Sequence, residues 1–331
     1  MALKIGILDQ SIVFPGQSPA DALANTIKLA QHAEMLGYER FWVSEHHDSP
    51  QMAGASPEVL ISHLLARTEK IRIGSGGVML QHYSPYKVAE NFNVLASLSP
   101  GRVDLGIGRA PGGLPRSTKA LQRVTDTAGP ADTLESKLTE LELLLRGSLE
   151  DDHPLAGLQA NPIPENPADI YLLGTSVSSA RLAAERGYPY AFALFINNDP
   201  ATAKEAFDTY RERFDRSKGA RPHAILALSV IAADTEEEAA ELASGFKSVR
   251  VTLASGKTVN VGSLEQAEEF AKQAGETFTA EVREPDITKG TKETVRARLL
   301  ELKKTYGADE LIFTTIVPDF EKRIKSFTLL K

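Results

Sequence analysis

A loop of small and hydroxyl-bearing residues at 174–179 stands directly before a predicted helix. The N-terminal end of a helix attracts anions through its free backbone N–H groups, and the hydroxyls of Ser176 and Ser179 could add hydrogen bonds. Arg109 lies among glycines after another predicted strand, and its planar guanidinium suits a phosphate. Either serine could instead cap the helix, and the arginine could be an ordinary surface residue. We favour a phosphate site made by the two segments together.

Two histidines, His46 and His47, follow a further predicted strand. One of them could donate a hydrogen bond or transfer a proton at a reaction centre. Consecutive residues at the end of a strand point to opposite sides, so the two rings are badly placed to bind one metal ion. The chain also lacks a spacing such as His-Glu-x-x-His, and we therefore expect no metal site. In the simplest alternative, each histidine only bonds a backbone carbonyl.

Other reaction classes have weaker support in the residues present. The chain has no cysteine, which excludes cysteine nucleophiles and thiolate metal sites. No Gly-x-Ser-x-Gly segment is present, and the glycines at 106, 108 and 112 have the wrong spacing for a dinucleotide-binding loop. Asp9 and Glu45 also follow predicted strands, so they could serve as acid and base in a hydrolase or lyase.

These side chains must be positioned by short apolar segments that alternate with amphipathic ones. We expect strands at 3–8, 41–43, 71–80, 102–107, 170–173, 190–196, 224–231 and 311–317, and helices at 21–36, 57–66, 85–98, 130–145, 176–186, 201–214, 235–253, 291–306 and 319–330. Several strands are apolar throughout, which is typical of a parallel sheet covered on both faces. The pattern predicts an α/β fold, a single (β/α)₈ TIM barrel over residues 1–331 with its catalytic residues after the strands. A doubly wound sheet with a small appended domain is the alternative.

Two segments exceed the minimal barrel, after the fourth and seventh βα units. Residues 147–169 are proline-rich and predict a surface insertion, and residues 254–289 contain a short helix at 264–274 and predict a mobile lid. The chain has 331 residues and a net charge of −7, which argues against a nucleic-acid or anionic-membrane surface. No apolar run approaches the roughly 18 residues of a membrane-spanning helix, and no secretory signal is visible, so we expect a cytoplasmic location.

Five segments, taken in order along the chain, are together specific. They lie at 8–11, 42–47, 73–80, 99–112 and 307–311, and they include the sequences Ser-Glu-His-His, Gly-Ser-Gly-Gly and Gly-Ile-Gly-Arg. This set resembles the bacterial luciferase-like flavin monooxygenase family, in particular its single-chain FMN-dependent oxidoreductase branch. The resemblance implies a (β/α)₈ barrel in which bound flavin supplies the chemistry and the protein supplies orientation and a dry pocket.

The resemblance also assigns a cofactor, partners and site residues. It implies reduced FMN, delivered by a separate NAD(P)H-dependent flavin reductase, which reacts with O₂ to oxygenate a small organic substrate, in a homodimeric enzyme. Gly76 and Gly77 match the position of a non-prolyl cis peptide beneath the flavin ring. The phosphate-binding positions correspond to Arg109, Ser176 and Ser179, and the histidine pair near the flavin, one of which assists catalysis, to His46 and His47.

The chain departs from the luciferase pattern in three places, one of them the divergent loop at 111–118, so light emission is not implied. Gly108 replaces a reactive cysteine near the flavin, and Arg123 is an uncertain counterpart of a second phosphate-binding arginine. Three alternatives stay open: hydride transfer with a deazaflavin coenzyme, FMN binding without turnover, and a phosphate-binding barrel lyase outside this family.

Overall fold

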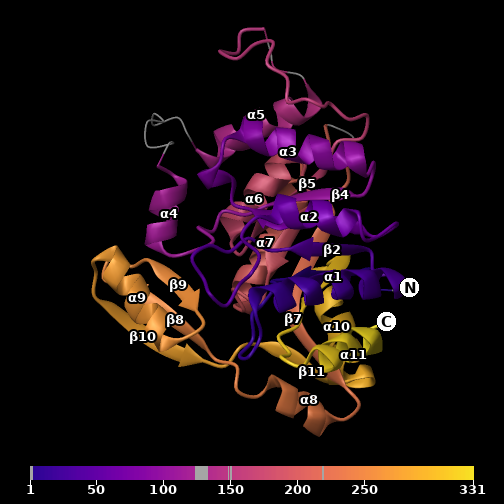
Figure 1. The fold of residues 1–331 in the computed structure, drawn as a ribbon, viewed down its shortest axis with the longest axis vertical. Coiled ribbons are helices and arrows are strands. Elements are labelled where there is room, and N and C mark those ends of the chain that lie inside the picture. The colour runs from indigo at the N-terminus through magenta and orange to yellow at the C-terminus, as the bar shows by residue number, and fades with distance from the viewer. Residues whose placement is uncertain (1–2, 124–132, 148, 150, 218–219) are drawn as a thin grey trace.

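Eight parallel strands close into a barrel with helices around it (Figure 1). The computed structural model describes residues 3–123, 133–147, 149, 151–217 and 220–331. The barrel strands are β1 (Ile5–Asp9), β2 (Arg40–Val43), β3 (Arg72–Val78), β4 (Val103–Ile107), β5 (Asp169–Gly174), β6 (Tyr190–Ala193), β7 (Ala224–Ala233) and β12 (Glu310–Thr314). Each strand pairs with the next, and the β6–β7 and β12–β1 pairings close the ring. The predicted (β/α)₈ barrel is confirmed.

The helices occupy the outside of the barrel, close to their predicted positions where these are described; the predicted start of the helix at 130–145 lies outside the described residues. They are α1 (Pro19–Met35), α2 (Pro57–Leu65), α3 (Pro85–Leu98), α5 (Leu134–Arg146), α6 (Val177–Arg186), α7 (Pro200–Arg213), α8 (Glu236–Ala243), α10 (Lys292–Tyr306) and α11 (Phe320–Leu329). A short helix that we did not predict, α4 (Pro115–Leu121), follows β4, and a 3₁₀ turn, η1 (Leu80–His82), follows β3. In the described part of the chain, no helix is long and apolar enough to cross a membrane.

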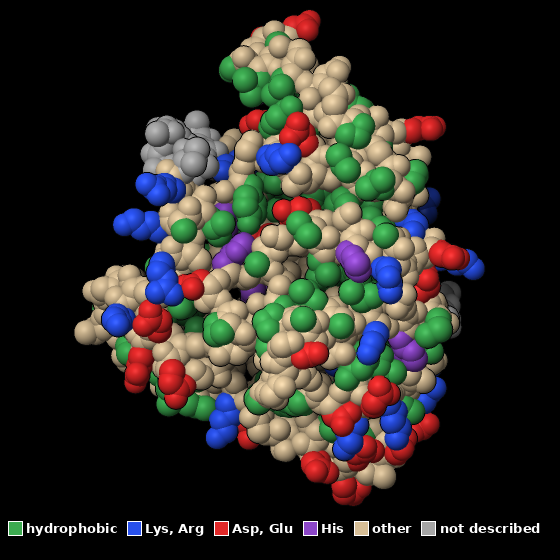
Figure 2. Space-filling model, in the orientation of Figure 1, with side chains coloured by type: hydrophobic (Ala, Val, Ile, Leu, Met, Phe, Trp, Pro, Cys, Tyr) green, Lys and Arg blue, Asp and Glu red, His purple; other side chains and the backbone are tan. Residues whose placement is uncertain are grey.

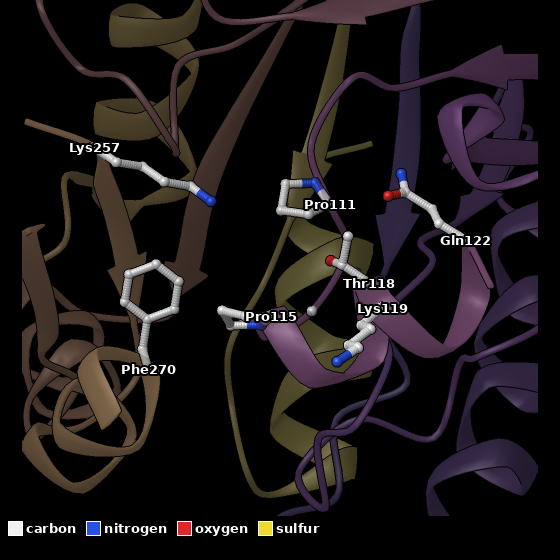
Figure 3. Close-up of a pocket in the computed structure, with 8 residues that line it drawn as sticks. Pro111, Pro115, Thr118, Lys119, Gln122, Lys257 and Phe270 are labelled. Atoms are coloured by element: carbon white, nitrogen blue, oxygen red, sulfur yellow. The ribbon is translucent and has the colours of Figure 1, made fainter. Parts of the chain in front are cut away.

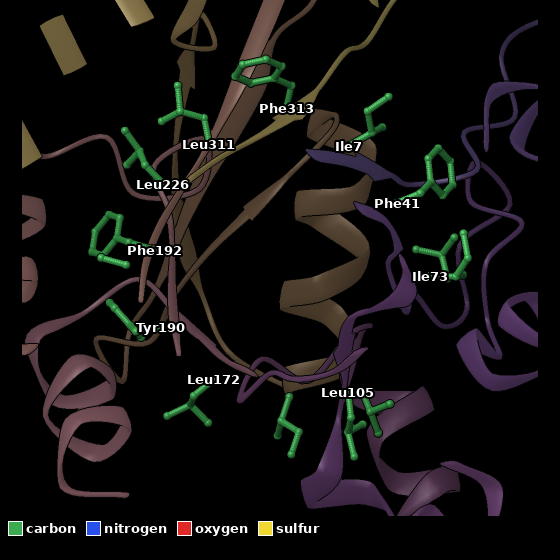
Figure 4. Close-up of a cluster of buried hydrophobic side chains, with 14 of the residues drawn as sticks. Ile7, Phe41, Ile73, Leu105, Leu172, Tyr190, Phe192, Leu226, Leu311 and Phe313 are labelled. Carbon is green, nitrogen blue, oxygen red and sulfur yellow. The ribbon is translucent and has the colours of Figure 1, made fainter. Parts of the chain in front are cut away.

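The apolar strands have two buried faces because the barrel has two hydrophobic layers. Side chains between strands and helices form the larger layer, and Figure 4 shows members from all eight barrel strands, among them Ile7, Phe41 and Leu226. Alternate residues such as Leu8 and Trp42 point into the barrel and form the smaller, inner layer. This arrangement explains why these strands are apolar throughout rather than alternating.

A buried charge network fills the barrel end opposite the strand C-termini. Arg40, at the start of β2, donates from Nε to Glu310 Oε1 at 2.7 Å and from Nη1 to Asp104 Oδ2 at 2.5 Å. It also donates to the hydroxyl of Tyr171 at 2.8 Å, and burial raises the pKa of that tyrosine to about 12. At this end of the barrel the charged side chains are therefore paired with one another.

The predicted helix at 235–253 is wrong in its second half. Helix α8 ends at Ala243, and Gly245 then adopts a positive φ of 82°. The next residues form a strand, β8 (Ser248–Leu253), in which Val249, Val251 and Leu253 are buried on one face. Their alternation has the period of a strand rather than of a helix, which is the physical reason for the correction.

The second insertion is an antiparallel module that packs beside α4 (Figure 1). It contains β8, β9 (Thr258–Val261), α9 (Leu264–Ala274) and β10 (Phe278–Arg283), in the strand order β10-β8-β9. The predicted helix at 264–274 is confirmed, but the folded module begins at 248 rather than 254. The chain then re-enters the barrel as β11 (Ile287–Thr291), which pairs with the C-terminal half of β7.

The first insertion, between α5 and β5, projects from the top of the view in Figure 1. Its described residues form turns and contain no helix or strand. One peptide bond within it, Asn161–Pro162, is cis.

Candidate functional site

Strands β3 and β4 approach each other so closely that only glycine fits between them. A Cβ on Gly77 would lie 2.6 Å from the carbonyl oxygen of Gly106, and a Cβ on Gly76 would lie 2.7 Å from Leu8 Cδ1 inside the barrel. The Gly76–Gly77 peptide is cis, as the resemblance implied. These glycines leave bare backbone near the C-terminal end of β3. Their role beneath a flavin ring stays a prediction.

A buried carboxylate holds one of the two predicted histidines. Glu45 Oε1 lies 2.7 Å from His47 Nε2 and accepts a hydrogen bond from the hydroxyl of Tyr83 at 2.8 Å. Its second oxygen, Oε2, accepts from the backbone N–H of Met79 at 3.1 Å, just beyond β3. Because Glu45 is only 1 % exposed, this carboxylate is satisfied entirely by the protein groups around it. His47 is thereby fixed in place at the C-terminal end of the barrel.

The neighbouring histidine has a different partner, as the alternation of side chains along an extended chain predicts. His46 Nδ1 lies 3.0 Å from the hydroxyl of Ser44, while its backbone N–H donates to Gly54. Burial lowers the pKa of His46, and the nearby His47 lowers it further. His46 is therefore a poor proton carrier at neutral pH and a better neutral hydrogen-bonding group. Among the described residues, no cluster of three or more His, Asp or Glu side chains is arranged to hold a metal ion.

A third histidine completes this cluster. His82, on η1, has its ring edge-on to His47 with 6.4 Å between ring centroids, and its Nε2 bonds the carbonyl of Pro111 at 2.8 Å. Its Nδ1 is buried without a hydrogen-bond partner in the described structure, and burial lowers its pKa. Figure 2 shows histidine side chains beside a hollow left of centre, above the β8–β10 module.

Sequence reasoning gave Glu45 a different role and missed Tyr83. Glu45 and His47 are two residues apart near a strand end, so alternation puts them on one side, and that signal was available. Tyr83 carried no local signal, because only the turn after β3 brings it to the carboxylate. Asp9 is not available as the acid or base of a lyase, because its buried carboxylate is bound by Arg323 and Thr26.

The predicted phosphate residues follow neighbouring strands. Arg109 is exposed two residues after β4, and Ser176 is the N-cap of α6 two residues after β5. The pairing of Ile107 with Leu172 makes these strands adjacent.

The serines also have structural tasks. The hydroxyl of Ser176 accepts from the backbone N–H of Ser179, and the hydroxyl of Ser179 donates to the carbonyl of Ser176 at 2.7 Å. Ser178, which the sequence analysis did not single out, is exposed and its hydroxyl lies 3.0 Å from that of Ser176. The capping alternative is therefore realised, and phosphate binding by these residues stays a prediction.

Comparison with known proteins shows which family the chain belongs to. Residues 3–310 match the family model described as luciferase-like monooxygenase. The N-acetyl-S-alkylcysteine monooxygenase of Bacillus subtilis is 44 % identical over 99 % of this chain and 97 % of that protein. The crystal structure of apo-MsnO8 is 33 % identical, with a TM-score of 0.80 over 99 % of this chain and 96 % of that one.

A more distant structure shares the fold. The oxygenating constituent of 3,6-diketocamphane monooxygenase from Pseudomonas putida, solved in complex with FMN, is 19 % identical with a TM-score of 0.73, over 100 % of this chain and 97 % of that one. The family match covers the module and the barrel up to the start of β12, and the Bacillus subtilis relative is similar over nearly its whole length. The chain therefore belongs to the luciferase-like monooxygenase family and is an enzyme with monooxygenase activity.

Proposed function

We propose that this enzyme uses reduced FMN and O₂ to oxygenate a small organic substrate, with N-acetyl-S-alkylcysteines as the first substrates to try. The observation that carries the proposal is the full-length similarity to the Bacillus subtilis N-acetyl-S-alkylcysteine monooxygenase, at 44 % identity. The relative's substrate is an N-acylated amino acid that carries an alkyl thioether. In the balanced reaction, reduced FMN supplies two electrons and two protons, one oxygen atom enters the substrate and the other leaves as water.

The residues at the strand ends fit FMN in size and charge. Arg109 is exposed, and the hydroxyls of Ser176 and Ser178 lie at the N-terminal end of α6, where a phosphate is favoured. Gly76 and Gly77 present backbone without side chains, so a flat ring can lie close to them. In this assignment Arg109 and the N-terminal end of α6 bind the phosphate, and Gly76 and Gly77 lie against the flavin ring.

His47 is the residue that we assign to proton handling. Its Nε2 is held by Glu45, and its Nδ1 makes no hydrogen bond within the described part of the chain. A ring held at one nitrogen leaves the other free to hold or move a proton at the substrate or flavin. Tyr83 supports the arrangement by donating to the same carboxylate oxygen.

The proposal includes a separate NAD(P)H-dependent flavin reductase, a cytoplasmic location and a homodimer. O₂ uptake should require both a reductase and this enzyme when NADH, FMN and N-acetyl-S-butylcysteine are supplied. Mass spectrometry should then show a product derived from addition of one oxygen atom. Light scattering of the purified protein tests the homodimer.

The flavin site is tested by titration with FMN, reduced FMN and a deazaflavin, following fluorescence. We expect Arg109→Ala to weaken FMN binding about tenfold, which is the loss of one charge-assisted contact of about 1.4 kcal/mol. Arg296→Ala changes an exposed arginine on α10 and serves as the matched control. Equal affinities of Arg109→Ala and the parent would refute the site, and tighter deazaflavin binding without O₂ uptake would favour hydride transfer instead.

A further inference from the structure

A hollow of about 320 Å³ lies between α4 and the β8–β10 module (Figure 3). Its volume is within the range of small-molecule sites. One wall comes from the loop after β4 and from α4, and the other from the module. The lining residues are Pro111, Gly113, Pro115, Thr118, Lys119, Gln122, Lys257 and Phe270.

The charge of this hollow is one-sided. Its lining contains two lysines, Lys119 and Lys257, and no aspartate or glutamate. Neither lysine makes an ion pair within the part of the chain that the structure describes. By contrast Arg116, on the same helix as Lys119, is paired with Asp48 at 2.8 Å. In a protein with a net charge of −7, two unpaired cations facing one hollow favour an anionic ligand there.

The rest of the lining is apolar or neutral. The ring of Phe270 lies 5.7 Å from the ammonium of Lys257, and Figure 3 shows both on the module side with Lys119 across the gap. Pro111 and Pro115 add apolar surface on the opposite wall, and Thr118 adds a hydroxyl. This combination suits a carboxylate attached to an apolar acyl or alkyl group rather than a bare inorganic anion.

The wall of the hollow is also the support of the histidine cluster. The backbone N–H of His47 donates to the carbonyl of Gly112 at 2.8 Å, and His82 bonds the carbonyl of Pro111. A Cβ on Gly113 would lie 2.7 Å from the carbonyl oxygen of His47. A molecule seated in the hollow is therefore separated from the histidines by the thickness of one glycine-rich loop.

We propose that Lys119 and Lys257 bind the carboxylate of an acidic substrate, while Phe270, Pro111 and Pro115 contact its apolar part. The inference rests on the proposed function, because it names the substrate class of the same enzyme: carboxylic acids with an apolar arm. The carboxylate is held between α4 and the module, and the apolar arm lies along residues 111–113, whose carbonyls bond His47 and His82. The two lysines select substrates and take no part in the oxygen chemistry.

The test separates the charge of the substrate from its shape. N-acetyl-S-butylcysteine and its methyl ester are compared as ligands of the FMN-loaded protein, by calorimetry and by KM, for the parent, Lys119→Gln and Lys257→Gln. We expect each substitution to weaken binding of the acid about fivefold, as for an exposed ion pair of about 1 kcal/mol, and to leave the ester unchanged. Binding of the acid, but not of the ester, should also weaken with added salt.

Lys272→Gln, an exposed lysine on α9, is the matched control and should behave like the parent. Lys257→Arg should restore binding of the acid. The inference is overturned if acid and ester are weakened equally, if the acid does not bind the parent, or if the lysine variants bind the acid as well as the parent does. It is also overturned if they lose FMN affinity, because the lysines then serve the cofactor phosphate.

Binding of the acid and its oxygenation are measured separately, so failure of the lysine site and failure of the proposed function can be distinguished. If the parent binds the acid through these lysines but consumes no O₂ with any reductase, the lysine site is supported and the proposed oxygenation fails. If it consumes O₂ and the lysine variants bind the acid normally, the oxygenation is supported and the lysine site fails.

Discussion

The carboxylate of Glu45 and the ring of His47 are joined at 2.7 Å, Oε1 to Nε2, two residues apart in the chain. The strand ending at Val43 brings both side chains to one side, and burial removes Glu45 from water. The relationship fixes which histidine nitrogen points away from the protein interior. Hydrogen bonding of this kind sets the tautomer and orientation of an imidazole.

Replacing Glu45 by Gln should lower kcat about 100-fold, the lower end of what a proton-transfer group contributes, because Glu45 orients His47. The amide has nearly the same shape but cannot accept from Nε2–H and the tyrosine as a charged group does. Steady-state rates across pH 5–9 measure the effect, and the pH profile should change shape, which a purely structural role would not cause. Glu237→Gln, on the exposed side of α8, is the control. A normal profile in Glu45→Gln would remove Glu45 from the mechanism.

Stability should fall as the pH drops below the unfolded histidine pKa of about 6.5. Burial lowers the pKa values of His46 and His82, so the unfolded chain binds more protons than the folded one in that range. The free energy of unfolding therefore rises with pH in that range, and this part of the stability is lost as the pH falls. Urea midpoints at pH 7.5 and 5.5 measure this loss, which His46→Asn should reduce. His63→Asn, an exposed position on α2, should leave it unchanged, and an equal reduction there would contradict the assignment.

Gly77→Ala should destabilise the protein by about 1–3 kcal/mol, because the new methyl group meets the Gly106 carbonyl at 2.6 Å. The same substitution at Gly108 meets only the flexible side chain of Met79, at 3.3 Å, and should cost less. Urea unfolding compares the two variants. Fluorescence titration should show a larger loss of FMN affinity for Gly77→Ala. Equal effects at both positions would argue against a special demand for bare backbone at Gly77.

The β8–β10 module should become more resistant to trypsin when flavin is bound, as expected for a lid. Its polar contacts with the rest of the chain include three hydrogen bonds, in which Gln273 accepts from Arg116 N at 2.9 Å, Gln266 bonds Gln51 at 3.0 Å, and Asn260 bonds the carbonyl of Ile196 at 3.1 Å. Glu269 also pairs with Arg116 at 3.9 Å, and Leu114 packs against the module's apolar core. Cleavage rates after Lys257 and Lys272, with and without FMN, measure the effect. Arg109→Ala, which should bind FMN weakly, should show little protection. Equal cleavage rates in the parent would make the module a passive insertion.

The sequence by itself determined the barrel and the order of its parts. Apolar strands without alternation indicate burial on both faces, and the barrel supplies that through its inner layer around Trp42 and its outer layer around Phe41. It also indicated that His46 and His47 would have different surroundings, whereas the cis peptide at Gly76 and Gly77 was implied only by the family resemblance. These features depend on local periodicity and residue size, which a single sequence records.

Only the tertiary structure decided which polar groups meet. Tyr83 reaches Glu45 across 38 residues, and Lys257 faces Lys119 only because the module folds back beside α4. Asp9 follows a strand just as Glu45 does, yet Arg323, 314 residues away, binds its carboxylate. Such contacts join segments distant in the chain, so no local spacing encodes them. They depend on how the closed barrel and its insertion pack.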